Sequence, residues 1–326
     1  ELDAEPAELT KAEENYRSMV ERDFREAAPF LGVSPQGSVS EPLAARYKDI
    51  RLKQKFPALA GTTWNGVTVF LPPANLIRAR AIHDELGREI RELETSFSTL
   101  LGQREETTAP GGRPRVDLVL FASESEMQSF LKSSSLNTEH SLGVFDPAAR
   151  TVFAVDPRAV SADRASEAMT TLRHETAHAW FYAAGIHSVA QTEGNWLIEG
   201  LAVYAQGETV GAPSPASVAV LKKAKDEGRL FELRDLVKVR DRGGFLALGD
   251  ADRIEIAYLQ SGHLVRLLMS ESMRIRFFHY LNYLRRPGNV AALAEREPFV
   301  VLLEQLELSA KELDETFARS LESERL

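Results

Sequence analysis

The sequence predicts an α+β fold, with a small mixed sheet in the first half of the chain and a mostly helical second half. Two observations support this class. Short runs rich in β-branched and aromatic residues, bounded by proline or glycine, occur between residues 64 and 157, and such runs are typical of strands. Beyond residue 160, apolar residues recur at helical spacing in segment after segment. Strands and helices are therefore segregated along the chain, as they are in α+β proteins.

The expected elements follow a simple order. Residues 64–73 (WNGVTVFLPP) predict a strand that two prolines end, and residues 74–102 predict a long helix. The segment 116–123 predicts a strand, 124–134 a short helix, and 142–157 two strands joined by a turn. The latter pair includes an edge strand ahead of the next helix. Further helices are expected at 161–185, 195–208, 218–239, 251–271, 273–286 and 298–323, with a glycine-rich loop at 241–250.

These elements suggest two parts of unequal size. Residues 1–60 are expected to form an N-terminal extension, a helix plus a loop, whose function the sequence does not indicate. Residues 61–326 are expected to form one domain. In that domain, residues 61–160 supply the sheet and its helices, and residues 161–326 supply the helical part that carries the functional site.

Composition excludes several functional classes. The net charge is −9 and no run is rich in lysine or arginine, which argues against a nucleic-acid partner. No stretch approaches 18 consecutive apolar residues, so no transmembrane segment is expected. The chain contains no cysteine. Any metal ligands must therefore be histidine, aspartate or glutamate.

The segment TTLRHETAHAWFY, residues 170–182, contains the most informative pattern. His174 and His178 are four residues apart, so on a helix both imidazoles lie on one face and can reach one cation. Glu175 follows the first histidine and can take a proton from a water that the metal activates. This HExxH spacing is typical of zinc hydrolases; the alternative is a helix that carries these polar residues by chance.

A catalytic zinc site needs a third protein ligand and an open position. Glu199 lies 21 residues after His178 within the apolar segment NWLIEGLAVYAQG. A carboxylate in such a segment is costly to bury unless it is paired or bound to a metal. We expect Glu199 to complete a site for one zinc ion per chain, in preference to forming a buried ion pair with Arg173. Gly200, next to it, would allow close approach of another helix.

HExxH followed about twenty residues later by W-L-x-E-G-x-A resembles the gluzincin group of zinc metallopeptidases. The sequence is more similar to a bacterial peptidase MA-like family of unknown function, through WLIEGLAVY at 196–204 and AYLQSGHLVRLL at 257–268. The resemblance covers roughly residues 115–326 and implies a zincin-like fold. It also implies that His174, His178 and Glu199 bind zinc and that Glu175 is the general base.

The resemblance further implies an oxyanion donor, a tyrosine or histidine some sixty residues beyond the glutamate ligand. Tyr258 is preferred because it lies in the A-Y-x-x-S pattern, and His263 is the alternative. The G-A-M-E-N signature of aminopeptidases is absent, so exopeptidase specificity is not implied. Val203 replaces the acidic residue that often orients a zinc histidine. The candidates for that orienting role are Asn195, Thr171 and Gln206.

In enzymes of this kind, an edge strand ahead of the motif helix often pairs with an extended peptide. The segment GVFDPAARTVFAV, which contains these two expected strands, supplies the candidate substrate-binding residues Val144, Phe145, Val152 and Phe153. An ordinary internal hairpin is the alternative interpretation of the same two strands.

The sequence thus predicts a zinc-dependent metallopeptidase acting on peptide or protein substrates. The alternative, from a different class, is a non-catalytic binding or scaffolding protein that retains the fold of a zinc peptidase. The chain opens ELDAEP without a methionine. Together with the bacterial resemblance, this favours an exported protein, periplasmic or extracellular, over a cytoplasmic one.

Overall fold

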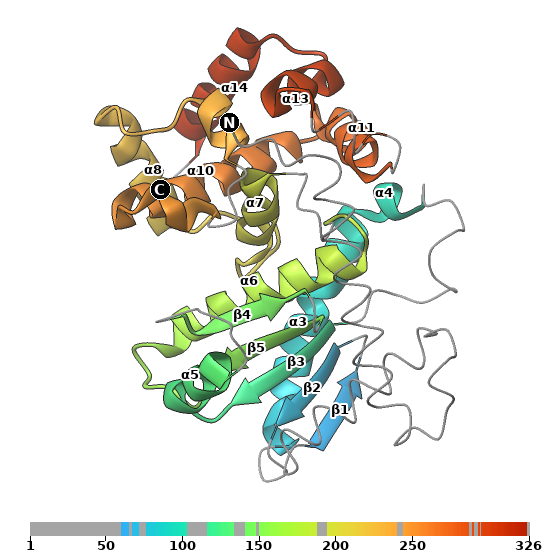
Figure 1. The fold of residues 1–326 in the computed structure, drawn as a ribbon, viewed down its shortest axis with the longest axis vertical. Helices are drawn as coiled ribbons and strands as arrows, with labels where there is room; N and C mark the ends of the chain where they lie inside the picture. Colours follow the sequence, from blue (N-terminus) through green and yellow to red (C-terminus); the bar gives the residue numbers. More distant parts are fainter. Residues whose placement is uncertain are drawn as a thin grey trace.

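The computed structural model describes residues 60–64, 67–71, 76–102, 116–133, 141–147, 150–187, 194–239, 244–286, 289, 293 and 295–324. These residues form one five-stranded sheet and a helical half that lies above it in the view of Figure 1. The predicted α+β class is confirmed. The helix and loop expected within residues 1–59 lie outside the described residues.

The sheet is mixed, with the strand order β1-β2-β3-β5-β4. Its central strands β2, β3 and β5 are parallel, and the two edge strands β1 and β4 pair antiparallel with β2 and β5. The strands are β1 (Ala60–Trp64), β2 (Val67–Leu71), β3 (Val116–Phe121), β4 (Gly143–Asp146) and β5 (Thr151–Val155). The single strand predicted at 64–73 is a hairpin; β1 was missed because its sequence AGTTW contains small residues of low strand propensity.

Successive side chains of the strands point to opposite faces of the sheet, and each face has its own core. Leu118 and Val152 face a large core shared with α3 and α6, whereas Val119 and Phe153 face a smaller core shared with α5. Figure 1 shows α6 lying along the sheet beside β4. The sheet is therefore the support that fixes the position of α6.

The helical half agrees with the sequence in outline and differs in its interruptions. The helix expected at 218–239 is divided where Gly228 adopts a φ of 64°, and the loop expected at 241–250 contains a 3₁₀ turn. None of the described helices has the length and apolar character that crossing a bilayer requires. The helices are α3 (Leu76–Ser96), α4 (Ser98–Gly102), α5 (Glu124–Ser133), α6 (Ala165–Ala183), α7 (Asn195–Ala205), α8 (Pro215–Asp226), α9 (Leu233–Lys238), η2 (Gly244–Leu248), α10 (Ala251–Leu268), α11 (Arg274–Arg285), α13 (Pro298–Leu306) and α14 (Ala310–Ser323).

Helices α7 and α10 cross in unusually close contact. A Cβ atom added at Gly200 of α7 would lie 2.7 Å from the carbonyl oxygen of Ser261, and one added at Gly262 of α10 would lie 2.3 Å from a methyl group of Val203. Only glycine fits at either position without a shift of the helices. The close approach that Gly200 predicted is confirmed, and it brings α10 beside the helix that carries Glu199.

Candidate metal centre

Helix α6 holds its two histidines rigidly because the helix is buried on most sides. Leu172, Trp180 and Phe181 have no exposed surface, and both aromatic rings pack on Phe97, with centroids 6.1 and 5.2 Å away. The helix ends as predicted at Gly185, whose φ of 65° and N–H bond back to the helix form a left-handed cap. This packing fixes the face on which the HExxH residues lie.

The three predicted ligands converge. The Nε2 atoms of His174 and His178 are 3.1 Å apart, and one carboxylate oxygen of Glu199 lies 3.2 and 3.3 Å from them. Zinc ligands at about 2.0–2.2 Å in a tetrahedron are about 3.3–3.6 Å from one another. The distances between the ligand atoms are therefore close to those around a bound metal ion, and these residues form a group that could hold one.

The three ligand side chains are not fully buried. The side chains of His174, His178 and Glu199 keep 14, 11 and 21% of their surface exposed. A closed structural metal site would bury all its ligands, whereas a catalytic site keeps a position for water or substrate. The expected competing role for Glu199, an ion pair with Arg173, is not formed, because Arg173 pairs instead with Glu85 of α3.

The electrostatics of the group favour a positive charge where the ligand atoms meet. Burial lowers the pKa of His174, but the hydrogen bond to Glu199 and the charges of Glu175 and Glu199 outweigh it and raise the pKa to about 9. Burial raises the pKa of Glu199, but the charge of His178 and hydrogen bonds from both histidines outweigh it and lower the pKa. A divalent cation would supply this positive charge in place of protons.

Gln206 orients the first histidine. Its side-chain oxygen lies 2.8 Å from Nδ1 of His174. Because an amide oxygen only accepts, Nδ1 carries the proton and Nε2 presents its lone pair to a metal. Among the three candidates for this role, Gln206 has it. The amide of Asn195 instead donates to the carbonyl of Val239, and Thr171 packs against Gly143.

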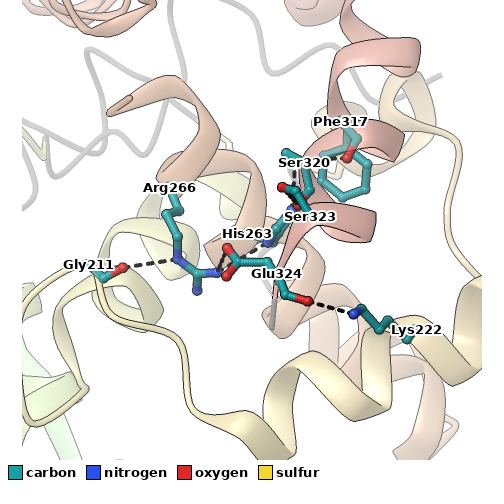
Figure 2. Close-up of polar contacts among 8 residues, drawn as sticks. All are labelled: Gly211, Lys222, His263, Arg266, Phe317, Ser320, Ser323 and Glu324. Carbon is teal, nitrogen blue, oxygen red and sulfur yellow. Dashed lines mark hydrogen bonds and ion pairs between the residues drawn. The ribbon is translucent and has the colours of Figure 1, made fainter. Parts of the chain in front are cut away.

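The loop after Gln206 is held from two sides. The carboxylate of Glu92 on α3 accepts from the N–H of Val210 at 2.9 Å, and Arg266 on α10 donates to the carbonyl of Gly211 at 3.0 Å. Figure 2 shows Arg266 between Gly211 and Glu324, the residue that follows α14. The residue that orients His174 therefore leads into a fixed loop.

Glu175 contacts the edge of the sheet. Its carboxylate accepts a hydrogen bond of 2.7 Å from the N–H of Phe145 in β4. In the antiparallel pair of β4 and β5, the N–H of Val155 donates to the carbonyl of Leu142. Residues next to such a bonded pair alternate in direction along a strand, so Gly143 and Phe145 direct their backbone groups away from β5. The expected general base therefore lies where the open edge of β4 meets the metal group.

The two candidate oxyanion donors lie on different faces of α10. The ring of Tyr258 is 6.3 Å from that of His174 and packs edge-on against Phe245. His263 is buried on the far side, where its ring nitrogens contact Ser320 and Arg266. Five residues of an α-helix turn through about 140° from the starting face. The alternative assignment of His263 is therefore wrong.

Two of the four candidate substrate-binding residues lie on the edge strand, and the other two lie on an internal strand. Val144 and Phe145 lie in β4, at the edge of the sheet, as predicted. Val152 and Phe153 lie in β5, whose backbone pairs with β3 on one side and β4 on the other. Their side chains are 0 and 3% exposed. Strand addition at Val152 and Phe153 is excluded, and both are core residues.

The sequence favoured a plain loop histidine at His187 over one that touches substrate. In the structure, the turn after α6 folds His187 back beside the metal group. Its ring lies 6.1 Å from that of His178 and 5.3 Å from that of Phe181. Burial and the nearby His178 lower the pKa of His187 to about 3. Its ring nitrogens have no hydrogen-bond partner among the described residues. The signal in the sequence was Gly185, because a glycine at the end of a helix favours a left-handed cap at which the chain changes direction.

Fold and site together define an α+β protein with a His–His–Glu group suited to a metal ion. In a comparison with known families, residues 168–287 match the family described as "Protein of unknown function (DUF1570)". The matched segment contains the three potential ligands, Glu175, Gln206 and Tyr258. No curated protein matches the chain. The gluzincin resemblance stays a prediction, because the matched family has no described function.

Proposed function

We propose that the chain is a zinc-dependent metallopeptidase of the gluzincin kind, with a zincin-like fold and Glu175 as general base. The observation that carries the proposal is the position of Glu175. It follows a potential metal ligand, and its carboxylate bonds to the edge of β4 at Phe145. A metal, a base and a strand edge that could hold an extended peptide are the parts that peptide hydrolysis needs.

The donor set favours zinc. Two imidazole nitrogens and one carboxylate oxygen are ligands that zinc takes in catalytic sites, with a fourth position left for water. Hard cations such as magnesium and calcium prefer oxygen ligands throughout. When bound, zinc supplies a Lewis acid that polarises the scissile carbonyl and lowers the pKa of water towards 7.

Glu175 moves the protons in the proposed reaction. One of its oxygens accepts from the N–H of Phe145, which fixes the carboxylate and leaves the other oxygen for the attacking water. Glu175 takes a proton as that water attacks the carbonyl carbon, and then passes the proton to the leaving amine as the C–N bond breaks.

Tyr258 stabilises the negative charge that develops on the carbonyl oxygen. Burial raises the pKa of its phenol, and the charges of Glu199 and Glu175 raise it further. The phenol therefore stays protonated and can donate a hydrogen bond throughout the physiological pH range. Its ring lies 6.3 Å from that of His174, so the donor belongs to the surroundings of the metal group.

The edge of β4 positions the substrate. The carbonyl of Phe145 points away from β5, and no described residue donates to it, so an extended peptide can donate a backbone N–H there. The hydroxyl of Ser141 contacts both the N–H and the carbonyl of Gly143. Ser141 thus covers the outward-facing backbone groups of Gly143 and leaves the carbonyl of Phe145 as the accessible group of this edge.

The test is cleavage of denatured casein by the zinc-loaded chain beside the Glu175→Gln variant. Glutamine still accepts from Phe145 but cannot take a proton, so we expect activity to fall by about 10²–10⁴-fold with zinc content unchanged. Equal activity in the variant would contradict the role of Glu175. A zinc-loaded wild-type chain that cleaves neither casein nor a mixed peptide library would favour the non-catalytic binding protein instead.

A further inference from the structure

We infer that the rings of Phe145 and Tyr182 form an apolar subsite that receives an aromatic or large aliphatic side chain of the substrate. That side chain belongs to the substrate residue that stands opposite Phe145 when an extended peptide pairs with the edge of β4. The inference rests on the proposed peptidase function and names a substrate class for it. Segments with such an apolar residue at one fixed position, within two residues of the cleaved bond, are preferred.

The first argument is the face of the sheet to which Phe145 points. Its side chain packs against the larger core shared with α3 and α6, whereas that of Val144 packs against the smaller core. The ring of Phe145 lies 5.6 Å from that of Tyr182 on α6, and the two rings are tilted by 58°. Both residues are only partly buried. This aromatic pair therefore keeps apolar surface that the protein does not cover.

The second argument is the side of α6 from which Tyr182 projects. Tyr182 follows Glu175 by seven residues, and seven residues of an α-helix turn through about 700°, which returns to within about 20° of the starting direction. The carboxylate of Glu175 reaches the outward-facing N–H of Phe145. This side of the helix therefore faces the open edge of β4, and Tyr182 lies on it two turns beyond the proposed base.

The third argument is the geometry of strand addition. Residues opposite each other on paired strands point to the same face of a sheet, with Cβ atoms about 4.5–5.5 Å apart. The substrate residue opposite Phe145 therefore places its side chain beside the ring of Phe145. Because Glu175 bonds to the N–H of Phe145 and an extended peptide rises about 3.3 Å per residue, that residue lies within two residues of the reacting bond.

The fourth argument is that the subsite exists before a peptide binds. Two contacts hold the ring of Tyr182. The first is the ring of Phe145, and the second is the guanidinium of Arg150, whose Cζ lies 6.0 Å from the ring centroid. Surface that is already ordered loses little conformational entropy when a ligand binds. An aromatic side chain of the substrate can add a tilted ring contact to the pair.

The experiment begins with a map of the bonds that the zinc-loaded full chain cleaves in denatured casein. We expect phenylalanine, tyrosine, leucine and methionine to be enriched at one position within two residues of the cleaved bonds. Tyr182→Ala should remove most of that enrichment, and Tyr182→Leu, which keeps apolar surface, should retain it. Tyr283→Ala removes another partly buried tyrosine, on α11, and should leave the profile unaltered.

A binding measurement separates recognition from turnover. Labelled peptides that span the best-cleaved casein bond, with phenylalanine, alanine or glutamate at the enriched position, are titrated with the zinc-loaded Glu175→Gln chain. We expect the phenylalanine peptide to bind about tenfold more tightly than the alanine peptide, the lower end of what an apolar pocket gives. Adding Tyr182→Ala should reduce this ratio to about twofold. Tyr182→Gln keeps the length of the side chain without its ring and should reduce the ratio equally, which distinguishes a lost subsite from a loosened helix.

The failure of this inference differs from the failure of the proposed function. Cleavage with no apolar preference, or a preference that neither Tyr182→Ala nor Tyr182→Gln reduces, would overturn the subsite and leave the peptidase standing. Absence of any cleavage by the zinc-loaded wild-type chain would overturn both.

Discussion

Two polar clusters lie on opposite faces of α10. They contain similar residue types, but these residues have different roles in the two clusters. The metal group consists of His174, His178 and Glu199, and Tyr258 of α10 lies beside it. The α14 joint consists of His263, Arg266 and Glu324 and fastens the C-terminal helix (Figure 2). Both clusters combine buried imidazole with a carboxylate, so composition alone does not distinguish them.

The metal group and the α14 joint differ in the group that supplies the positive charge beside the carboxylate. In the α14 joint, Arg266 pairs with Glu324 at 3.0 Å, and the two nitrogens of His263 are engaged by Ser320 and Arg266. In the metal group, no described lysine or arginine pairs with Glu199, and three ligand atoms point at one another. The carboxylate of the α14 joint is paired within the fold by a guanidinium, whereas the metal group lacks such a partner among the described residues and could hold a metal ion.

The largest difference between the clusters is expected in catalysis. Tyr258→Phe removes the proposed oxyanion donor and should lower kcat by about 10²–10³-fold with zinc content unchanged. His263→Gln, on the far face of the same helix, should leave kcat within about twofold of wild type. Steady-state kinetics on casein-derived peptides measures both. Equal losses in the two variants would mean that α10 matters only as a scaffold.

Metal affinity gives a smaller contrast. Gln206→Leu removes the acceptor for Nδ1–H of His174 and should weaken zinc binding by about 10–100-fold. Glu324→Gln breaks the ion pair with Arg266 instead; it should cost about 1 kcal/mol in the free energy of unfolding and leave zinc affinity unchanged. Competition with a chromophoric chelator and denaturant titration give the two quantities. Unaltered affinity in Gln206→Leu would contradict the orienting role.

The smallest contrast is in pH dependence, and the two clusters differ in sign. Burial, then the charge of Arg266, lowers the pKa of His263 to about 4. Its neutral form therefore contributes stability above pH 6.5, and this contribution is lost as the pH falls towards 4. The pKa of His174 is raised to about 9; in metal-free protein its contribution is complete below pH 6.5 and is lost as the pH rises through 9.

Melting temperatures of chelator-treated protein from pH 4 to 9 measure both effects. The difference between wild type and His263→Gln should change on the acid side only, and that between wild type and His174→Gln on the alkaline side only. Parallel curves for the three proteins would show that neither histidine is coupled to folding.

Much of the metal group could be predicted from sequence because its constraints are local. Two histidines four apart on a helix share a face whatever the tertiary structure. Glu199 in an apolar run needs a partner in any fold. The orientation of Tyr258 and His263 on α10 could also have been predicted locally, because a separation of five residues places two side chains on different faces of a helix.

Other features needed the tertiary structure. Whether β4 or β5 is the edge strand depends on β3 pairing with β5 across a long stretch of chain, so Val152 could not be distinguished from Phe145. The hydrogen bond between Gln206 and His174 depends on how α7 packs on α6. The contact of Arg150 with Tyr182 depends on a left-handed turn at a residue type that seldom adopts one.

The metal content of the purified protein shows whether HETAH and Glu199 form a metal site. Inductively coupled plasma mass spectrometry on protein purified without chelators, beside His178→Ala and His263→Gln, makes the measurement. We expect about one zinc per chain in wild type and in His263→Gln, and almost none in His178→Ala. A wild-type chain that holds no metal even after zinc is added back, or His178→Ala with the same zinc content as wild type, would contradict this expectation.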